Sequence, residues 1–440
     1  MKELFFELAA FGESQLRGSE VLLANFSGEV SDFVRFNQSR VRQPTTVRQA
    51  VLELKLISGQ RHDSTAITLS GERDHDRAQV AHVIATMRAT LPTLPADPYL
   101  LYCQEADQSN TVRSGRLPSA EEAIATVTQE AAEVDLVGIF AAGPSLRGFA
   151  SSLGARHWHE VDSFLFDWSL YHSTDKAVKS SWGGDRWDPA ELGRRLEAAR
   201  GQLAHLAQPA RTIAPGQYRA YLAPAAVDEL VSMLNWGGVS AKAQRTKQSV
   251  VQRLVDGEEQ LSPKVHLSEA TGSGLEPLFD AAGFTKPAAV ELIRAGQHAG
   301  CLASPRTAKE YGISANGAGD DEAAASLDLA PGTLAADQAL NQLGTGLYLS
   351  NLWYLNFSDR PSCRITGMTR FACFWVEEGK IVAPLNVMRF DDSLYQLLGE
   401  RLVDLTDEAE WILSASTYGS RSLSTTRMPG ALVSGMTFTL

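Results

Sequence analysis

The segment at residues 46–56 constrains the fold most, because apolar and polar side chains alternate along it. An alternation with a period of two places the apolar side chains on one face of a β-strand and leaves the other face to solvent, as in an antiparallel sheet. Ser58, Gly59 and Gln60 predict a turn into a further strand at residues 63–69. The apolar members of the alternation are Val47, Ala50 or Val51, Leu52, Leu54 and Leu56.

Helices and further strands are predicted around this segment. Apolar residues at helical spacing indicate one helix before it and one after it, the second with Asp74 as its N-cap. Pro92, Pro95 and Pro98 then mark a joint. We therefore expect residues 1–95 to form an N-terminal α+β domain. Its expected elements are helix 2–16, strands 20–25 and 32–37, and helix 74–91.

Two further domains are expected after the joint. Residues 96–212 predict a middle α/β domain, in which Asp188 and Pro189 start the last helix. Residues 213–440 predict a β-rich C-terminal domain, in which the Gly/Ala/Asp-rich residues 317–331 form an exposed loop. The fold class is α+β, with an antiparallel sheet in the N-terminal domains and a mostly β C-terminal domain. The expected elements are helix 119–133, strands 135–142, 148–153 and 157–172, helix 188–207, strand 217–222 and helix 225–234.

The charge balance excludes one class of partner. The chain has 40 Lys and Arg against 52 Asp and Glu, which gives a formal net charge of -12. Nucleic-acid binding depends on neutralising phosphates with Lys and Arg, and the densest basic run, residues 242–247, holds three cations. We therefore expect no nucleic-acid partner.

The distribution of apolar residues and cysteines indicates a cytoplasmic protein without membrane contact. The longest uncharged apolar run, residues 136–142, is far shorter than the roughly 20 residues of a membrane span. Glu3, Glu7 and Glu13 interrupt the apolar N-terminus, which predicts an amphipathic helix rather than a signal peptide. The four cysteines form no C-x-x-C pair and are expected to be reduced thiols.

The histidine spacing argues against a helical zinc site. Such a site needs two histidines one turn apart on one helix face, beside a glutamate. None of the nine histidines lies three, four or five residues from another. Serine and cysteine also lack a nucleophile motif such as G-x-S-x-G. We therefore expect no catalytic residue in this chain.

One strand remains a metal candidate. His157 and His159 share a strand face and can bind one metal together with His172, with Glu160 adjacent. The strand is also rich in aromatic residues, among which histidines usually serve as packing or surface residues. Both interpretations stay open, a metal site and a packing role.

A series of motifs lies between residues 344 and 400. It comprises a Thr-Gly step, an arginine, a Phe-Trp pair, a Glu-x-Gly turn, a proline and an L-x-x-L ending. By itself it predicts strands 372–376 and 381–388 joined by a tight turn. The pattern resembles the C-terminal domain of the TldD/PmbA family of metallopeptidases, in its PmbA (TldE) branch; residues 34–42 and 185–199 resemble its first two domains. The motif residues are Thr366, Gly367, Arg370, Ala372, Phe374, Trp375, Glu377 or Glu378, Gly379, Pro384 and residues 394–398.

The resemblance implies where a catalytic zinc would lie. Catalytic TldD-type members carry His-Glu-x-x-x-His on the helix that opens the third domain, with the glutamate as general base. That frame falls on Ser232, Met233 and Gly237 here, and residues 206–265 contain no histidine. Without such ligands a catalytic zinc cannot be held or its water activated. The resemblance thus implies no zinc in this chain and zinc only in a TldD-type partner.

The resemblance implies a non-catalytic subunit or homologue of a TldD/PmbA-type zinc peptidase assembly that acts on peptides. The partner would be a TldD-type subunit or a second copy in a dimer. Thr366, Arg370 and Trp375 are candidates for a peptide groove in which edge strands pair with an extended peptide; a structural ion pair is the alternative for Arg370. Two other hypotheses stay open: a stand-alone peptide-binding or interaction protein, and an independent metalloenzyme using His157 and His159.

Overall fold

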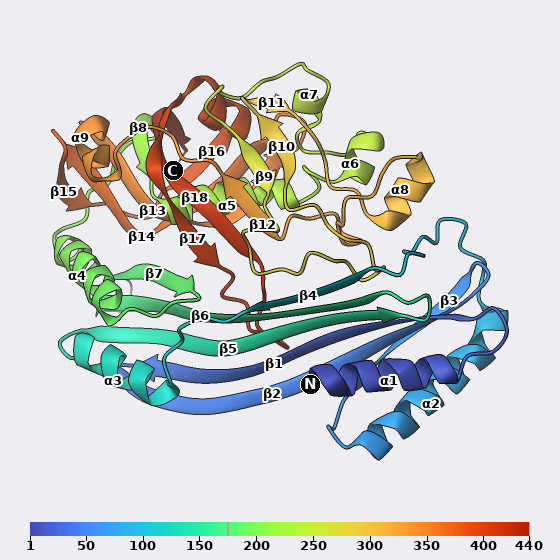
Figure 1. Cartoon of the computed structure of the whole chain (residues 1–440). Coiled ribbons are helices and arrows are strands. Elements are labelled where there is room, and N and C mark those ends of the chain that lie inside the picture. Colours follow the sequence, from blue (N-terminus) through green and yellow to red (C-terminus); the bar gives the residue numbers. More distant parts are fainter. Residues whose placement is uncertain (174–175, 440) are drawn as a thin grey trace.

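Two large β-sheets dominate the computed structural model, which describes residues 1–173 and 176–439 (Figure 1). The first sheet has seven strands in the order β3-β2-β1-β5-β6-β4, with β7 paired to β6. It is antiparallel apart from the β4–β6 pair, and a mostly β C-terminal part follows, so the predicted fold class is confirmed. The strands are β1 (Val21–Asn37), β2 (Arg40–Ser58), β3 (Arg61–Thr68), β4 (Gln108–Arg113), β5 (Asp135–Ser151), β6 (Arg156–Ser173) and β7 (Lys176–Gly184).

β1 and β2 form a long hairpin that the sequence only partly predicts. The two strands predicted at residues 20–25 and 32–37 are in fact one strand, β1, paired with β2 along its whole length. Gln38 and Ser39 close the hairpin with φ values of 51° and 56°, the positive-φ geometry of a type I′ turn. Because neither residue is a usual choice for such a turn, the sequence pattern did not reveal this hairpin.

β5 is likewise a single strand where two were predicted, at residues 135–142 and 148–153. Gly143 allows this continuity: its φ is 139°, and a Cβ there would lie 2.1 Å from the Val30 carbonyl oxygen. The glycine therefore bends β5 past β1 instead of ending it. Since β1 pairs with β5, the first sheet continues across the predicted boundary at residue 95.

The helices of the first half begin close to their predicted positions. The Ser119 hydroxyl accepts a hydrogen bond from the Glu122 amide at 3.1 Å, and the Asp188 carboxylate accepts one from the Ala190 amide at 3.0 Å. Both are N-caps of the expected kind. α4 packs between β6 and β7 of the first sheet and β14 and β15 of the second. The helices are α1 (Lys2–Ser14), α2 (Arg73–Thr90), α3 (Ala120–Glu130) and α4 (Pro189–Leu206).

The predicted N-cap of α2 is wrong. The helix begins at Arg73, with Glu72 rather than Asp74 at the N-cap position. Asp76 is fully buried and accepts hydrogen bonds from the Ser70 and Gly71 amides at 2.9 and 3.0 Å. This carboxylate fixes the preceding turn and thereby sets where the helix starts.

The second sheet contains eleven strands, and β18 pairs with both β16 and β8 so that its central strands close on themselves. The predicted hairpin at residues 372–388 is present as β14 and β15, with Glu378 and Gly379 at φ values of 49° and 76° in its turn. The strands are β8 (Gly216–Leu222), β9 (Leu267–Glu269), β10 (Val290–Arg294), β11 (Gln297–His298), β12 (Ser326–Leu329), β13 (Gly346–Asp359), β14 (Arg364–Glu377), β15 (Lys380–Pro384), β16 (Arg389–Ser393), β17 (Leu402–Leu413) and β18 (Thr425–Phe438).

The exposed loop predicted at residues 317–331 is wrong in part. Its last third forms β12, which lies between β9 and β18 and buries Leu327 and Leu329. The Ala/Asp-rich composition concealed these two apolar residues, which alternate with polar ones.

The helix α5 (Pro224–Ser232) lies against β13 and β18 and buries its apolar side in the main core of the second half. A 3₁₀ turn at Met233–Asn235 continues it, and Gly237, with φ 89°, follows in the left-handed conformation that glycine commonly supplies after a helix. In the described part of the chain, no helix combines the length and apolar composition needed to cross a membrane. The other helices are α6 (Ala241–Arg245), α7 (Gln252–Val255), α8 (Pro305–Tyr311) and α9 (Ala339–Leu343).

The loop between β17 and β18 reaches down to the first sheet (Figure 1) and inserts Arg421 there. Arg421 is buried, donates hydrogen bonds to Ser31 Oγ and the Ser163 carbonyl oxygen, both at 2.9 Å, and lies 3.6 Å from the Glu29 carboxylate. This contact fixes the second half of the chain on the first sheet.

Candidate functional site

The helix α5 carries two adjacent carboxylates that the sequence analysis did not single out. Asp228 accepts a hydrogen bond from Ser232 Oγ at 3.3 Å. Glu229 Oε2 is shielded from solvent and has no hydrogen-bond partner among the described residues. The sequence did contain a signal for these two residues, because Asp228 and Glu229 lie beside the apolar stripe of a short helix. The stripe is Ala226, Val227, Leu230 and Val231.

Burial raises the pKa of both carboxyl groups, and that of Glu229 reaches about 8. The charge of Asp228 raises the pKa of Glu229 further, whereas the Leu352 amide and the Arg370 guanidinium act in the opposite direction. Glu229 is therefore largely protonated near neutral pH. A neutral carboxyl group is a poor ligand for a cation.

Ser232, Met233 and Gly237, the residues that align with the zinc-binding motif, lie at the end of α5 and do not point to a common position. Ser232 is hydrogen-bonded to Asp228, Met233 is buried in the apolar core, and Gly237 lies beyond the 3₁₀ turn. Zinc requires deprotonated carboxylates, thiolates or neutral imidazoles in sufficient number. Among residues 1–173 and 176–439, no three His, Cys, Asp or Glu side chains come close enough to hold a metal ion. The residues on α5 therefore do not fit a catalytic zinc.

The predicted peptide-groove residues Thr366, Arg370 and Trp375 all lie on β14. Thr366 pairs with β13 on one side and β16 on the other, so its backbone is already hydrogen-bonded. Trp375 donates a hydrogen bond to Glu377 at 2.6 Å and stacks under the Arg211 guanidinium. Both flanks of β14 are occupied, which disfavours backbone pairing of a peptide with this strand.

Arg370 makes contacts of a different kind from those expected. Its guanidinium carbon lies 4.0 Å from the centroid of the Trp353 ring and 4.9 Å from that of Phe371. These are cation–π distances. In the described chain no ion pair of Arg370 accompanies them, so the structural ion pair considered as the alternative is not the observed role.

The two histidines of β6 occupy packing positions. His157 Nδ1 lies 2.8 Å from Ser109 Oγ, and its ring stacks on Phe279 at 5.2 Å. His159 Nε2 donates to the Leu275 carbonyl oxygen at 2.9 Å, and burial lowers its pKa to about 4. His172 lies near the other end of the same strand. At a rise of about 3.3 Å per residue it is roughly 40 Å from His159. The geometry matches the packing interpretation rather than the metal interpretation.

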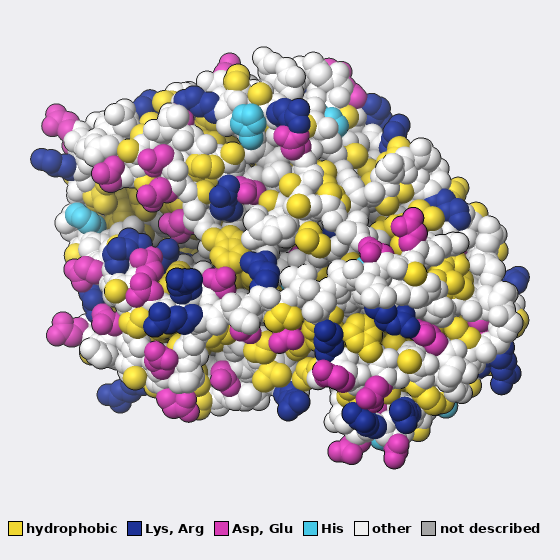
Figure 2. All heavy atoms as spheres, in the orientation of Figure 1, with side chains coloured by type: hydrophobic (Ala, Val, Ile, Leu, Met, Phe, Trp, Pro, Cys, Tyr) yellow, Lys and Arg dark blue, Asp and Glu magenta, His cyan; other side chains and the backbone are white. Residues whose placement is uncertain are grey.

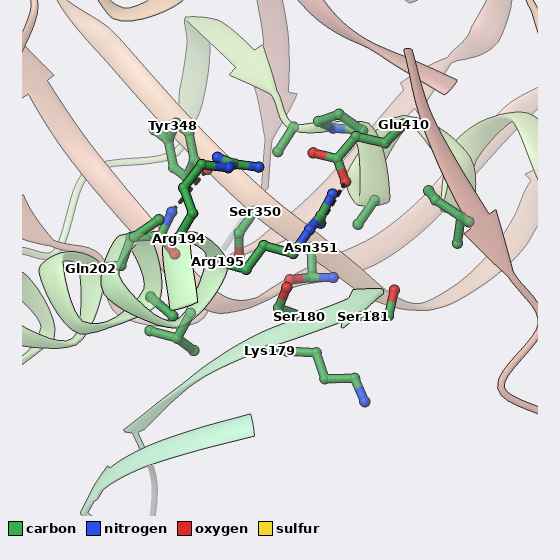
Figure 3. A pocket seen from close by; sticks show the side chains of 17 residues that line it. Lys179, Ser180, Ser181, Arg194, Arg195, Gln202, Tyr348, Ser350, Asn351 and Glu410 are labelled. Atoms are coloured by element: carbon green, nitrogen blue, oxygen red, sulfur yellow. Dashed lines mark hydrogen bonds and ion pairs between the residues drawn. The ribbon is translucent and has the colours of Figure 1, made fainter. Parts of the chain in front are cut away.

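A cavity of about 240 Å³ opens between the two halves of the chain. It lies where β7 and α4 face the N-terminal end of α5, β13 and β17 (Figure 3). Figure 2 shows basic side chains interleaved with acidic ones on the side of the molecule where α4 lies. Since the walls of the cavity come from elements far apart in the sequence, no local motif could have revealed this cavity. The labelled polar lining residues are Lys179, Ser180, Ser181, Arg194, Arg195, Gln202, Tyr348, Ser350, Asn351 and Glu410.

Hydrogen bonds and ion pairs hold part of this lining in place. Gln202 Nε2 donates to the Tyr348 hydroxyl at 3.2 Å, and burial raises the pKa of Tyr348 to about 12, so the phenol keeps its proton. Arg195 lies 3.8 Å from Glu410. Asn351 is only 8% exposed, and within the described chain its Oδ1 has no hydrogen-bond partner. The cationic groups of the lining are also paired with carboxylates, Lys179 with Asp167 and both Arg194 and Arg195 with Glu191.

Solved structures with the same fold are known. TldE from Thermococcus kodakarensis superposes with a TM-score of 0.78 at 14% identity, over 99% of this chain and 100% of that one. A candidate modulator of a DNA gyrase from Thermotoga maritima gives 0.77 at 15% identity, over 99% of each chain. A similar protein from Bacteroides thetaiotaomicron gives 0.74 at 15% identity, over 100% of this chain and 98% of that one.

The sequence comparison is more specific than the shared fold. No curated protein matches the chain. Residues 215–440, however, match the family described as the PmbA/TldA metallopeptidase C-terminal domain, which confirms the resemblance found in the motifs of residues 344–400. The chain therefore belongs to the PmbA/TldD metallopeptidase family.

Proposed function

We propose that the chain is a non-catalytic subunit, or a non-catalytic homologue, of a PmbA/TldD-type peptidase assembly that acts on peptides in the cytoplasm. Family membership supports the link to peptide chemistry. The observation that carries the non-catalytic part is α5, on which Asp228 and Glu229 are adjacent, partly buried and shifted towards their protonated forms. Zinc catalysis needs the opposite arrangement, with several ligands deprotonated around an open coordination position.

An exposed aromatic surface supports assembly with a partner. Trp353 and Tyr354 on β13 are 48% and 76% exposed, and their ring centroids lie 5.6 Å apart. Arg370 stacks on the same Trp353 ring. Tryptophan, tyrosine and arginine are enriched at the centres of protein interfaces. In this proposal the partner is a TldD-type subunit, which would hold the zinc, or a second copy of the chain.

Peptide hydrolysis by the purified chain tests the non-catalytic role. The full chain, incubated with zinc and unfolded peptide substrates, is expected to cleave at the background rate with and without a chelator. The variant Glu229→Gln should show the same rate. A chelator-sensitive rate well above background that falls at least tenfold in Glu229→Gln would overturn the proposal. A similar fall in His157→Ala/His159→Ala would instead favour the independent metalloenzyme.

Co-purification separates the proposal from a stand-alone peptide-binding protein. Co-expressed with a TldD-type homologue, the tagged chain is expected to retain it through size-exclusion chromatography. Replacing Trp353 by alanine should weaken that complex, whereas Trp411→Ala, on β17, serves as a tryptophan control. A stable homodimer that never retains the homologue, together with peptide binding, would favour the stand-alone protein.

A further inference from the structure

A second cavity, of about 320 Å³, lies between the first sheet and the segment that follows β9 in the second half of the chain. Its floor comes from β1, β2, β3 and β5, and its roof comes from residues 276–281, Lys286 and the loop after α8. Asn25 Nδ2 on the floor donates a hydrogen bond to the Ala281 carbonyl oxygen on the roof at 3.0 Å. The volume falls at the lower end of the roughly 300–1,000 Å³ range of small-molecule sites.

Two cations at one end of this cavity have no ion pair in the part of the chain that the structure describes. Half-buried Arg147 on β5 donates one hydrogen bond, from Nη1 to the Leu146 carbonyl oxygen at 2.9 Å. Lys286 extends over Gly317, where a Cβ would lie 2.3 Å from the lysine Cγ, so the glycine makes room for the lysine. Burial lowers the pKa of His159 on the neighbouring strand, and the charges of Arg147 and Lys286 add to this shift, so both cations lie near the same place.

The carboxylates at this end do not cancel the two cations. Glu276 attracts Arg147, although no ion pair joins the two among the described residues. Asp280 is buried, and its Oδ1 accepts hydrogen bonds from the Ala282 and Phe284 amides, both at 2.9 Å. Burial also raises the pKa of Asp280. Two cations therefore face one free carboxylate, and a recess with an excess of one sign of charge concentrates ligands of the other sign.

Glu53 supplies the opposite charge at the other end of the cavity. It is exposed on β2, lines the cavity and has no hydrogen bond or ion pair of its side chain within residues 1–173 and 176–439. Ser27 on β1 lies opposite Arg147 on one side and Val51 on the other, and Glu53 lies two residues beyond Val51. At about 4.8 Å between strands and about 3.4 Å per residue, the backbone positions of Arg147 and Glu53 are about 12 Å apart. Side chains stand roughly perpendicular to a sheet, so the charged ends keep about this spacing.

We propose that this cavity binds a dipeptide whose two ends are both free. The C-terminal carboxylate would accept hydrogen bonds from Arg147 and Lys286, and the N-terminal ammonium would donate to the carboxylate of Glu53. Ser27 and Asn25 provide a polar floor for the peptide group between the two ends. The choice of a peptide rests on the peptide role proposed above, whereas the cavity itself is separate from α5.

The spacing of the charges favours a ligand of two residues. An extended chain spans about 3.5 Å per residue, so a dipeptide is about 7 Å long. A hydrogen bond of about 3 Å at each end brings the distance between the protein groups to about 13 Å, close to the spacing of about 12 Å. A single amino acid bridges only about 9.5 Å in the same way. An inorganic anion would leave Glu53 unpaired, and an amine would leave Arg147 and Lys286 unpaired.

Calorimetry on the full chain tests the proposal with matched ligands. The probes are dialanine with both ends free, its C-terminal amide, its N-acetyl form and free alanine. Dialanine is expected to bind at least tenfold more tightly than each of the other three. No binding of dialanine at millimolar concentration, or equal affinity for either blocked form, would overturn the proposal. Free alanine binding as tightly as dialanine would overturn it as well.

Variants assign each end of the dipeptide to a named residue. Arg147→Gln removes the group assigned to the carboxylate, so dialanine should then bind no more tightly than its amide, whereas Arg147→Lys should retain the preference. Glu53→Gln should abolish the preference for dialanine over its N-acetyl form. Arg42→Gln, at an exposed arginine elsewhere on β2, should bind dialanine like the parent.

Circular dichroism shows which variants are folded. A folded Arg147→Gln or Glu53→Gln that keeps its tenfold preference contradicts the assignment. Since Glu53 is exposed, its variant tests the site even where Arg147→Gln fails to fold.

The site and the proposed function fail separately. Absence of dialanine binding would overturn this site and leave the non-catalytic role standing. Chelator-sensitive peptide hydrolysis would overturn the non-catalytic role and leave dialanine binding standing.

Discussion

Replacing Arg421 by methionine tests how the two halves of the chain are held together. Arg421 is 6% exposed and reaches from the loop after β17 into the first sheet, where Glu29 is 3% exposed. Its guanidinium hydrogen-bonds to Ser31, to Ser163 and to the Gly143 carbonyl oxygen. Methionine fills much of the same space but can neither donate these hydrogen bonds nor balance the charge of Glu29.

The expected cost follows from what the substitution leaves behind. Removing one partner of a buried ion pair usually costs about 3–5 kcal/mol, because the remaining charge stays desolvated. Glu29 keeps hydrogen bonds from the Ser31 hydroxyl and the Gln49 amide in this structure. These bonds offset part of the loss, so we expect the free energy of unfolding to fall by about 3 kcal/mol, at the lower end of that range.

Urea unfolding followed by circular dichroism measures this change. Arg427→Met is the matched control, because Arg427 is 48% exposed and pairs with Asp328 at 3.0 Å near the same loop. A surface pair of this kind contributes less than about 1 kcal/mol. The double variant Arg421→Met/Glu29→Gln should be more stable than the sum of the two single changes predicts, because no buried charge is left unpaired. If Arg421→Met costs no more than Arg427→Met, the role given to this contact is wrong.

Four further outcomes follow from the structure. Since burial raises the pKa of Glu229 from the ordinary 4.5 to about 8, the folded chain loses stability between about pH 5 and pH 8, where the unfolded carboxyl ionises first. In urea unfolding, the free energy of unfolding of Glu229→Gln relative to that of the parent should therefore be higher at pH 8 than at pH 5. The same difference at both pH values would contradict a raised pKa for Glu229. Asp188→Ala removes the cap of α4 and should cost about 1 kcal/mol of unfolding free energy, checked against Asp135→Ala at an exposed strand end. Arg370→Gln should cost about 0.5–2 kcal/mol by loss of the two cation–π contacts and change tryptophan fluorescence; an unaltered spectrum would argue against the stacking on Trp353. His157→Ala/His159→Ala should lower the melting temperature without changing the zinc content, and loss of bound zinc would restore the metal interpretation.

Elements whose signals are local could be predicted from the sequence. Asp188 was predicted to start its helix and caps it, and Ser119, the first residue of the predicted helix 119–133, is the N-cap of α3. The Glu378-Gly379 turn was recognised from its glycine, whereas the Gln38-Ser39 turn has the same backbone geometry without one. The β1–β5 pairing depends on contacts between residues more than 100 positions apart, as in Leu23 with Ser151, and no local pattern encodes it.

The candidate site was less accessible from the sequence than the fold. The family motifs drew attention to α5 and β14, but they say nothing about what Arg370 contacts. Asp228 and Glu229 could have been noticed as acids beside an apolar stripe, although only the packing of α5 against β13 and β18 reveals that they are partly buried. Asn351 is one polar residue in a strand, and no pattern in the sequence shows that its Oδ1 is shielded without a hydrogen-bond partner among the described residues.

A zinc competition titration tests most directly whether α5 can act as a catalytic metal helix. The full chain, freed of metal, competes with a chromophoric chelator for added zinc at neutral pH. We expect no site that binds zinc more tightly than about 1 μM, equivalent to about 8.2 kcal/mol. One equivalent of zinc bound at nanomolar concentration, weakened by Glu229→Gln but not by the exposed control Glu378→Gln, would contradict the non-catalytic role.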